Sequence, residues 1–173
     1  KQGKTVVHYS LELDDKTIAR RYDAAITGIP LDSLFAQKEE VFDKIKDVKG
    51  KLIIKEYPTK SASPETLRNH LSKLKERDID VGMIIVDYGD LLRPTMTRKE
   101  KREELETIYE ELRAIAKESG CPCYTASQTN RSGLNEPVIT MEAISEAFNK
   151  CFVADFIFTV SRTIDDKRTN TGR

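Results

Sequence analysis

Residues 83–92 read MIIVDYGDLL, an apolar run that ends in an acidic residue. Every position from 83 to 86 is apolar, which predicts a strand covered on both faces, as in a parallel sheet. Similar runs lie elsewhere in the chain. Together they predict strands at 6–10 (VVHYS), 52–56 (LIIKE), 83–87, 122–128 (PCYTASQ) and 154–161 (ADFIFTVS).

The segments between these runs carry apolar residues at helical spacing. Helices are predicted from 15 to a stop near Gly28, over about 39–48, from Ser63 onward, and over about 100–119. Ser63 followed by Pro64 is a typical helix start, because a serine side chain caps free backbone amides and proline suits the first turn. Gly120 is a typical stop.

The alternation of strands and helices predicts an α/β fold, with a mostly parallel, twisted sheet and helices on both faces. No internal repeat or long linker divides the sequence, so we expect a single domain over residues 1–173. In such sheets, ligands bind outside the carboxyl ends of the strands. The candidate site therefore consists of the polar clusters that follow the strands, at 10–12, 87–88, 128–131 and 161–162. Ser10 and Arg162 are members of these clusters and are expected, with Asp87 and Gln128, to bind the cofactor.

The composition narrows the classes of function. Lys and Arg number 29, and so do Asp and Glu, which gives a formal net charge of zero. This balance excludes a basic tail for polyanions but allows a local basic loop. No apolar run reaches the roughly 18 residues of a membrane span, and no leader is visible, so we expect a cytoplasmic protein without membrane contact. The three cysteines and two histidines form no zinc-ligand pattern.

Three polar positions are placed for nucleotide chemistry. Asp87, at the end of its strand, has the Walker B arrangement, in which a rigid carboxylate orients water on a nucleotide-bound Mg²⁺ ion. A loop cap is the alternative. Glu12 is placed to polarise water for attack on a γ-phosphate, or simply to open the next helix. Gln128 is placed to contact a γ-phosphate, or merely begins a polar loop.

Taken together, four stretches resemble the RecA-type motor domain of the DnaB-like hexameric replicative DNA helicases. They read SLEL, IIVDYGDLL, REELETIYEELRAIAKESGCPCYTASQTNRSG and VADFIFTVSR, and the resemblance spans residues 6–162. The resemblance implies a RecA-like fold, with ATP and Mg²⁺ as cofactors. It implies Glu12 as the catalytic base, Asp87 as the magnesium residue acting through water, and Gln128 as the γ-phosphate sensor.

The sequence departs from the family pattern in three places. No G-x-x-x-x-G-K-[ST] loop occurs, and the Gly3-Lys4-Thr5 triplet runs straight into a predicted strand instead of a helix. No arginine-finger strand is visible after residue 162. The segment MEAISEAFNKCFVAD at 141–155 lacks the common Arg-Glu-Ser-Gly core and looks more like a phage-type branch. We therefore expect a fragment that begins after the phosphate-binding loop and stops before the arginine finger.

One local basic cluster, LLRPTMTRKEKR at 91–102, directly follows the Walker B strand. In a channel loop such residues neutralise DNA phosphates without reading bases. The alternative is the solvated start of a charged helix. With the resemblance, the expected contacts to single-stranded DNA are Arg93, Arg98, Lys99, Lys101 and Arg131.

The resemblance implies a ring, expected to be a hexamer, that couples ATP hydrolysis to movement on single-stranded DNA in replication. A primase or a helicase loader is a further candidate partner. Two other functions remain open. One is a RecA-like recombination or regulatory ATPase that does not unwind DNA, and the other is a non-catalytic α/β module that lost its phosphate-binding loop.

Overall fold

The computed structural model describes residues 3–128, 150–160 and 168. In chain order the elements are β1 (Thr5–Ser10), α1 (Asp15–Thr27), α2 (Lys38–Ile45), β2 (Lys51–Glu56), α3 (Pro64–Lys75), β3 (Val81–Asp87), the 3-10 helix η1 (Gly89–Leu91), α4 (Lys101–Ser119), β4 (Cys123–Thr125) and α5 (Lys150–Val153). Four predicted helices and the first three predicted strands are confirmed to within a few residues.

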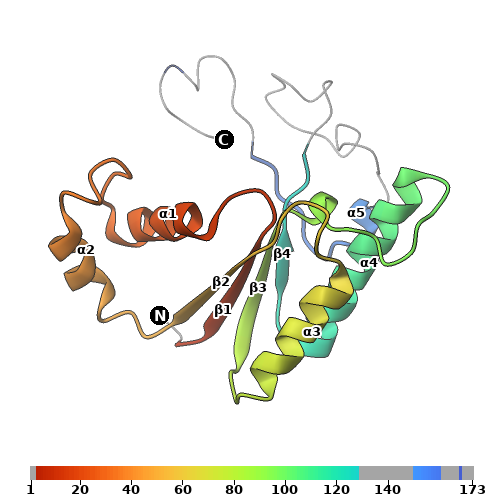
Figure 1. Cartoon of the computed structure of the whole chain (residues 1–173), viewed down its shortest axis with the longest axis horizontal. Coiled ribbons are helices and arrows are strands. Elements are labelled where there is room, and N and C mark those ends of the chain that lie inside the picture. Colours follow the sequence, from red (N-terminus) through yellow and green to blue (C-terminus); the bar gives the residue numbers. More distant parts are fainter. Residues whose placement is uncertain (1–2, 129–149, 161–167, 169–173) are drawn as a thin grey trace.

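The four strands form one parallel sheet in the order β2-β1-β3-β4. β1 lies inside the sheet, and its last residue, Ser10, is opposite Glu56 of β2 and Asp87 of β3. Because all four strands run in one direction, the residues that follow them gather at one edge, the upper edge in Figure 1. The prediction that Glu12 and Asp87 share an edge is therefore confirmed.

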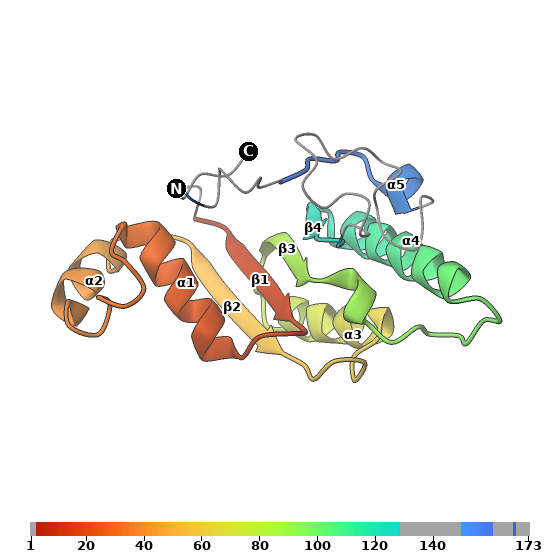
Figure 2. The same ribbon diagram turned by 90° about the horizontal axis from the view of Figure 1, so that it is seen from above.

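Helices cover both faces of the sheet, as predicted. α1 and α2 lie on one side, and α3 and α4 lie on the other (Figure 1, Figure 2). Neighbouring residues of β1 face opposite layers, as the alternation of a strand requires. His8 Nδ1 lies 2.9 Å from the Tyr22 hydroxyl of α1, whereas the Tyr9 hydroxyl lies 2.9 Å from His70 Nδ1 of α3.

The main apolar core lies between the sheet and the layer formed by α3 and α4. Its fully buried members include Val7 and Tyr9 of β1, Ile84 and Val86 of β3, Leu67 of α3, and Ile108 and Ile115 of α4. The helix stripes at 67, 71 and 74 and at 105, 108, 112 and 115 supply most of the helical side of this core. Burial of these stripes holds both helices against the sheet.

Residues at the helix ends determine where α3 begins and where α4 ends. Ser63 caps α3 by accepting from Thr66 N, and the Thr66 hydroxyl accepts from Ser63 N in return. Gly120 ends α4 with a φ of 62°, a left-handed conformation that favours glycine. Both predicted helix boundaries are confirmed.

β4 is shorter than predicted, Cys123–Thr125 instead of 122–128. The Thr125 hydroxyl donates to Val86 O and accepts from Gly89 N, both at 2.9 Å. The next residues leave the ladder, and Ala126 O lies 3.1 Å from the Tyr109 hydroxyl of α4. Side-chain hydrogen bonds to the backbone thus end the strand early.

The predicted strand at 154–161 is wrong over its described part, because residues 154–160 have no regular structure. Phe156 and Val160 are 82% and 71% exposed. An apolar run becomes a strand only where a neighbouring strand takes up its backbone hydrogen bonds. Within the described residues the sheet ends at β4, and Asp155 instead forms an ion pair with Arg113 of α4.

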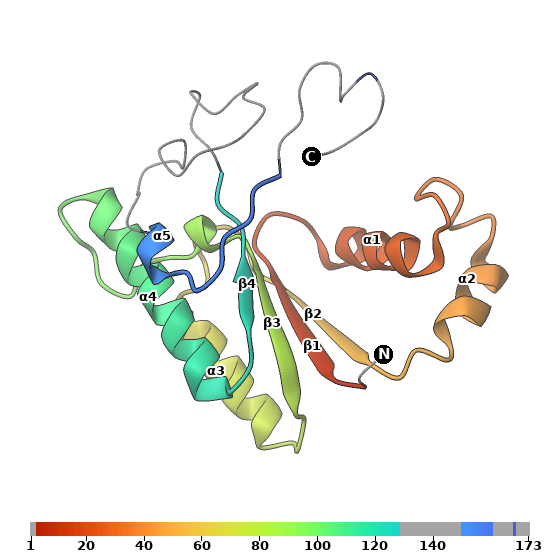
Figure 3. The same cartoon turned by 180° about the vertical axis from the view of Figure 1, so that it is seen from behind.

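The sequence patterns missed two short elements, η1 and α5. Each has only three or four residues, too few for an apolar period to stand out. α5 lies beside α4 (Figure 1, Figure 3). Within the described ranges, none of the helices has the length and apolar character needed to span a bilayer.

Stability is expected to fall as the pH drops below about 6.5. Burial, followed by the positive charges of Lys55, Lys73 and Arg77, lowers the pKa of His70 from its ordinary value of 6.5. The unfolded chain then binds protons that the folded chain does not, so this stabilisation is complete above the unfolded pKa and is lost as the pH falls. Urea midpoints measured between pH 7.5 and 5.5 should decrease, and less steeply in His70→Gln. Equal slopes for the two proteins would contradict this expectation.

Candidate nucleotide-binding edge of the sheet

Main-chain hydrogen bonds hold the turn after β1 between the turns after its two neighbours. Leu11 N donates to Asp87 O at 3.0 Å, and Tyr57 N donates to Ser10 O at 2.9 Å. The Thr59 hydroxyl also donates to Leu11 O at 2.9 Å. Glu12, the next residue, is exposed at this edge. The backbone that presents the Glu12 carboxylate is therefore fixed, while the side chain stays open to solvent.

The Ser10 side chain stabilises this turn through hydrogen bonds. It is fully buried, and its hydroxyl donates to Leu13 O and accepts from Leu13 N. Both functions of the hydroxyl are thus used within the turn. Any effect of Ser10 on a nucleotide would be exerted through the placement of Glu12.

Asp87 ends β3 with its side chain about one-third exposed. His8 Nε2 lies 4.0 Å from Asp87 Oδ2, and this buried nitrogen has no hydrogen-bond partner among the described residues. Burial lowers the pKa of His8, and the charge of Asp87 opposes that effect only in part. His8 is therefore neutral at pH 7. The sequence indicated a core histidine, and the structure adds that it lies beside the Asp87 carboxylate.

Tyr88 connects Gln128, the third predicted site residue, to the turn after β3. Gln128 Nε2 donates to the Tyr88 hydroxyl at 2.9 Å. Burial raises the pKa of Tyr88, followed by the negative charges of Glu12 and Asp90. The ring therefore lies within electrostatic reach of both acids while it holds Gln128. The sequence analysis placed this tyrosine in the candidate cluster at 87–88, because it directly follows the strand-end acid, but assigned it no individual role.

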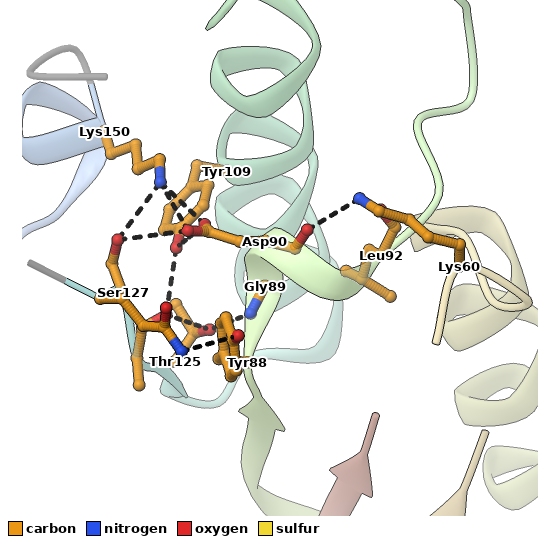
Figure 4. Close-up of polar contacts among 11 residues, drawn as sticks. Lys60, Tyr88, Gly89, Asp90, Leu92, Tyr109, Thr125, Ser127 and Lys150 are labelled. Carbon is orange, nitrogen blue, oxygen red and sulfur yellow. Dashed lines mark hydrogen bonds and ion pairs between the residues drawn. The ribbon is translucent and has the colours of Figure 1, made fainter. Parts of the chain in front are cut away.

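The end of β4 is bonded both to β3 and to the turn after β3, because the Thr125 hydroxyl donates to Val86 O and accepts from Gly89 N (Figure 4). A Cβ atom at Gly89 would lie 3.2 Å from the Thr125 hydroxyl oxygen and 3.3 Å from Leu112 Cδ1. The close fit leaves little room for a side chain at position 89. Asp87 and Gln128 are thus carried by two turns that are bonded to each other.

The predicted DNA contacts are only partly described. Arg93, Arg98, Lys99 and Lys101 are all exposed, on or next to the segment between η1 and α4. Two main-chain contacts anchor this segment, from Arg93 N to Ala62 O at 2.8 Å and from Arg98 N to a Glu104 carboxylate oxygen at 3.0 Å. Arg131 and Arg162 lie outside the described residues.

The donor set at this edge fits a magnesium ion held mainly by water and phosphate. One carboxylate, Asp87, is partly open to solvent at a strand end, which suits a hard cation that keeps most of its water. Within residues 3–128, 150–160 and 168, no cluster of three or more His, Cys, Asp or Glu side chains could cage a metal. Bound with a nucleotide, such an ion would neutralise charge between phosphate oxygens.

Comparison with known proteins places this edge in a family context. A family model of the DnaB-like helicase C terminal domain matches residues 1–138. The DnaB-like replicative helicase of Enterobacteria phage T4 is 30% identical over 173 residues, covering 93% of this chain and 36% of the phage protein. The replicative DNA helicase DnaB of Helicobacter pylori strain 26695 is 27% identical over 136 residues, covering 73% of this chain and 27% of that protein. The chain thus spans between about a quarter and a third of the length of these relatives.

Two solved structures share the fold. One, described as an ATPase domain, superposes with a TM-score of 0.77 at 17% identity, covering 96% of this chain and 62% of that one. A DnaB-like replicative helicase, described with its interactions with primase, also gives a TM-score of 0.77, at 16% identity, with coverage of 96% and 42%. These likenesses confirm the RecA-like fold that the resemblance implied. Since the family model matches most of the sequence, this chain belongs to the family of DnaB-like helicase C-terminal domains.

Proposed function

We propose that this domain is part of the ATP-driven motor of a ring-forming replicative helicase, which couples ATP hydrolysis to movement along single-stranded DNA. The observation that carries the proposal is the placement of Glu12 and Asp87 at one edge of a parallel sheet, where Gln128 is hydrogen-bonded to Tyr88, the neighbour of Asp87. Family membership supports it.

Each residue has a role that its position supports. The exposed Glu12 carboxylate accepts a proton from the attacking water. The Asp87 carboxylate would hold, through water, a Mg²⁺ ion that supplies positive charge to the phosphates of ATP. The Gln128 amide, now bonded to Tyr88, exchanges that partner for a γ-phosphate oxygen. Ser10 keeps Glu12 in place, and Arg162 is a further candidate for contact with the nucleotide. Catalysis of this kind depends on positioning and charge stabilisation.

The sequence contains no phosphate-binding loop, so the lysine and backbone amides that cradle the β- and γ-phosphates must come from another segment. We expect the 173-residue chain alone to show no magnesium-dependent ATP hydrolysis above background and only weak nucleotide binding. A phosphate-release assay with equilibrium dialysis of ATP measures both quantities. Clear turnover by the purified chain would contradict this expectation.

The exposed basic residues provide a site for the DNA backbone. Arg93, Arg98, Lys99 and Lys101 lie on the segment that follows the Asp87 turn, and Arg131 follows Gln128 by three positions. No aromatic residue occurs from 93 to 102, so the contacts would be to phosphates and would tolerate any sequence. The residues proposed for ATP hydrolysis and the residues proposed for DNA contact would then lie on the same two loops.

A ring, expected to be a hexamer, would bring neighbouring subunits together around ATP and enclose the DNA strand. A primase or a loader is a candidate partner, since one structural relative is described with primase. The competing function is a RecA-like ATPase without unwinding activity.

A forked-DNA unwinding assay on the assembled helicase that carries this domain separates the two functions. The proposal requires ATP-dependent strand separation that Asp87→Asn abolishes. DNA-stimulated ATP hydrolysis without strand separation would favour the competing function. Absence of hydrolysis in the assembled protein would favour a non-catalytic module.

A further inference from the structure

We propose that Lys150 is a positioning residue. Its ion pair with Asp90 holds the turn that carries Asp87 and the turn that carries Gln128 in fixed positions relative to helix α5. The consequence for turnover rests on the proposed function, whereas the positioning itself does not.

Lys150 joins Asp90, Ser127 and Tyr109 in a compact polar cluster (Figure 4). Its Nζ atom lies 2.8 Å from both carboxylate oxygens of Asp90 and 3.2 Å from the Ser127 hydroxyl. It also lies 5.2 Å from the centre of the Tyr109 ring, within the range of a cation–π contact. Three elements and one strand-end turn therefore meet at a single ammonium group.

Burial distinguishes this pair from the exposed ion pairs of the chain. The Lys150 side chain is 3% exposed and that of Asp90 is 19% exposed, whereas Lys4 and Asp80 form a 2.7 Å pair with exposures of 56% and 77%. An exposed pair adds little, because water solvates either charge alone. A buried ammonium group has no such alternative and must keep its partner. The Lys150–Asp90 contact is therefore a fixed constraint on the elements it joins.

Tyr109, on α4, gives Asp90 a second partner and further restricts its position. Its hydroxyl donates to Asp90 Oδ1 at 2.7 Å. Burial and the negative charge of Asp90 both raise the pKa of Tyr109, so this donor remains protonated. Asp90 thus has partners on α4 and on α5 at once, which fixes the orientation of η1.

The cluster and the nucleotide-binding edge occupy the same two turns. Asp90 follows Asp87 by three residues, and Ser127 immediately precedes Gln128. The Gln128 amide donates a hydrogen bond to the Tyr88 hydroxyl, and Tyr88 lies between Asp87 and Asp90 in the sequence. A shift of Ser127 relative to Asp90 would therefore move Gln128 relative to Asp87. Lys150, which contacts both Ser127 and Asp90, opposes such a shift.

The test uses the neutral double variant Lys150→Met/Asp90→Asn, which avoids leaving one buried charge without its partner. Its matched control is Lys4→Met/Asp80→Asn, the same exchange at the exposed pair. In the full 173-residue chain, backbone amide NMR signals of Asp87 and Gln128, which are not next to either substituted residue in the sequence, should shift in the first variant and stay unchanged in the control. Unchanged signals in both proteins would overturn the positioning role.

In the assembled helicase, the neutral double variant should lower kcat for DNA-stimulated ATP hydrolysis by about 10- to 100-fold, the range for a misplaced reacting group. The KM for ATP should stay within about twofold, because no group that binds the nucleotide is removed. Lys150→Arg, which keeps the charge, should recover part of kcat. A wild-type kcat in the double variant would overturn the catalytic consequence of the proposal. Failure of the unaltered helicase to hydrolyse ATP would instead overturn the proposed function, and the NMR comparison would still decide the positioning role.

Discussion

Replacing Glu12 with Gln is expected to lower the turnover number for ATP in the assembled helicase by about 10²- to 10⁴-fold, the usual loss when a general base is removed. The amide keeps the size of the carboxylate but cannot accept the proton of the attacking water. Nucleotide affinity should stay close to wild type, because the side chain acts in the transition state and the main chain of its turn is held by independent hydrogen bonds. Steady-state hydrolysis and equilibrium binding of a fluorescent ATP analogue measure the two effects separately.

Glu56→Gln is the matched control for this experiment. Glu56 ends β2 at the same edge, opposite Ser10, and its carboxylate accepts a hydrogen bond from Asp15 N at 3.2 Å. A glutamine oxygen can accept the same bond, so turnover should change by less than about twofold, within ordinary variation for a surface exchange. Wild-type turnover in Glu12→Gln would remove Glu12 from the chemistry. A similar loss in both variants would point to a general effect of charge at this edge.

Leu112→Ala is expected to reduce the free energy of unfolding by about 2–5 kcal/mol, the range for leucine truncation in a packed core. The Leu112 side chain is 3% exposed and belongs to the cluster that joins α4 to the sheet. Its Cδ1 atom also borders Gly89, where it limits the space above the turn after β3. Removing it leaves a cavity beside that turn. Urea unfolding of the chain, followed by far-UV circular dichroism, measures the loss.

The same exchange at an exposed leucine provides the comparison. Leu31 is 44% exposed in the segment between α1 and α2, and Leu31→Ala should cost less than about 1 kcal/mol because little buried area is lost. Equal losses at both positions would mean that α4 does not pack on the sheet as described. A small loss at Leu112 with an unchanged urea dependence would mean that the core closes around the missing atoms.

Local sequence signals predicted most of the fold because they act over a few residues. The Ser63-Pro64 start and the Gly120 stop marked the ends of α3 and α4 correctly. The uninterrupted apolar run ending at Asp87 predicted a strand buried within the sheet, and parallel pairing then placed Glu12 at the same edge. The run at 154–160 had similar local character but formed no strand. A strand also needs a neighbouring strand that takes up its backbone hydrogen bonds. The residues of the run determine its hydrophobicity, but they do not determine whether such a neighbour is present.

The same distinction applies to the candidate site, where some features could be predicted from the sequence and others could not. Asp87, Glu12 and Gln128 could be selected from the sequence because each polar residue follows an apolar run and matches a family motif. Tyr88 could not be given its part as the link among them, since its contact with Gln128 joins residues 40 positions apart. The position of His8 beside Asp87 likewise depends on the pairing of β1 with β3.

By itself, the sequence determined the order of strands and helices, the parallel α/β architecture and the polar edge where nucleotide chemistry is proposed, because apolar periods and helix caps are short-range properties. Only the tertiary structure decided which strands pair, where β4 ends and which charges are buried together. The Lys150–Asp90 pair illustrates the difference, since it joins residues 60 positions apart and is 3% exposed on the lysine side. Nothing in the residues around Lys150 distinguishes it from a solvated surface lysine. Its burial follows from α5 lying beside α4, and a buried ammonium group then requires a charged partner such as the Asp90 carboxylate.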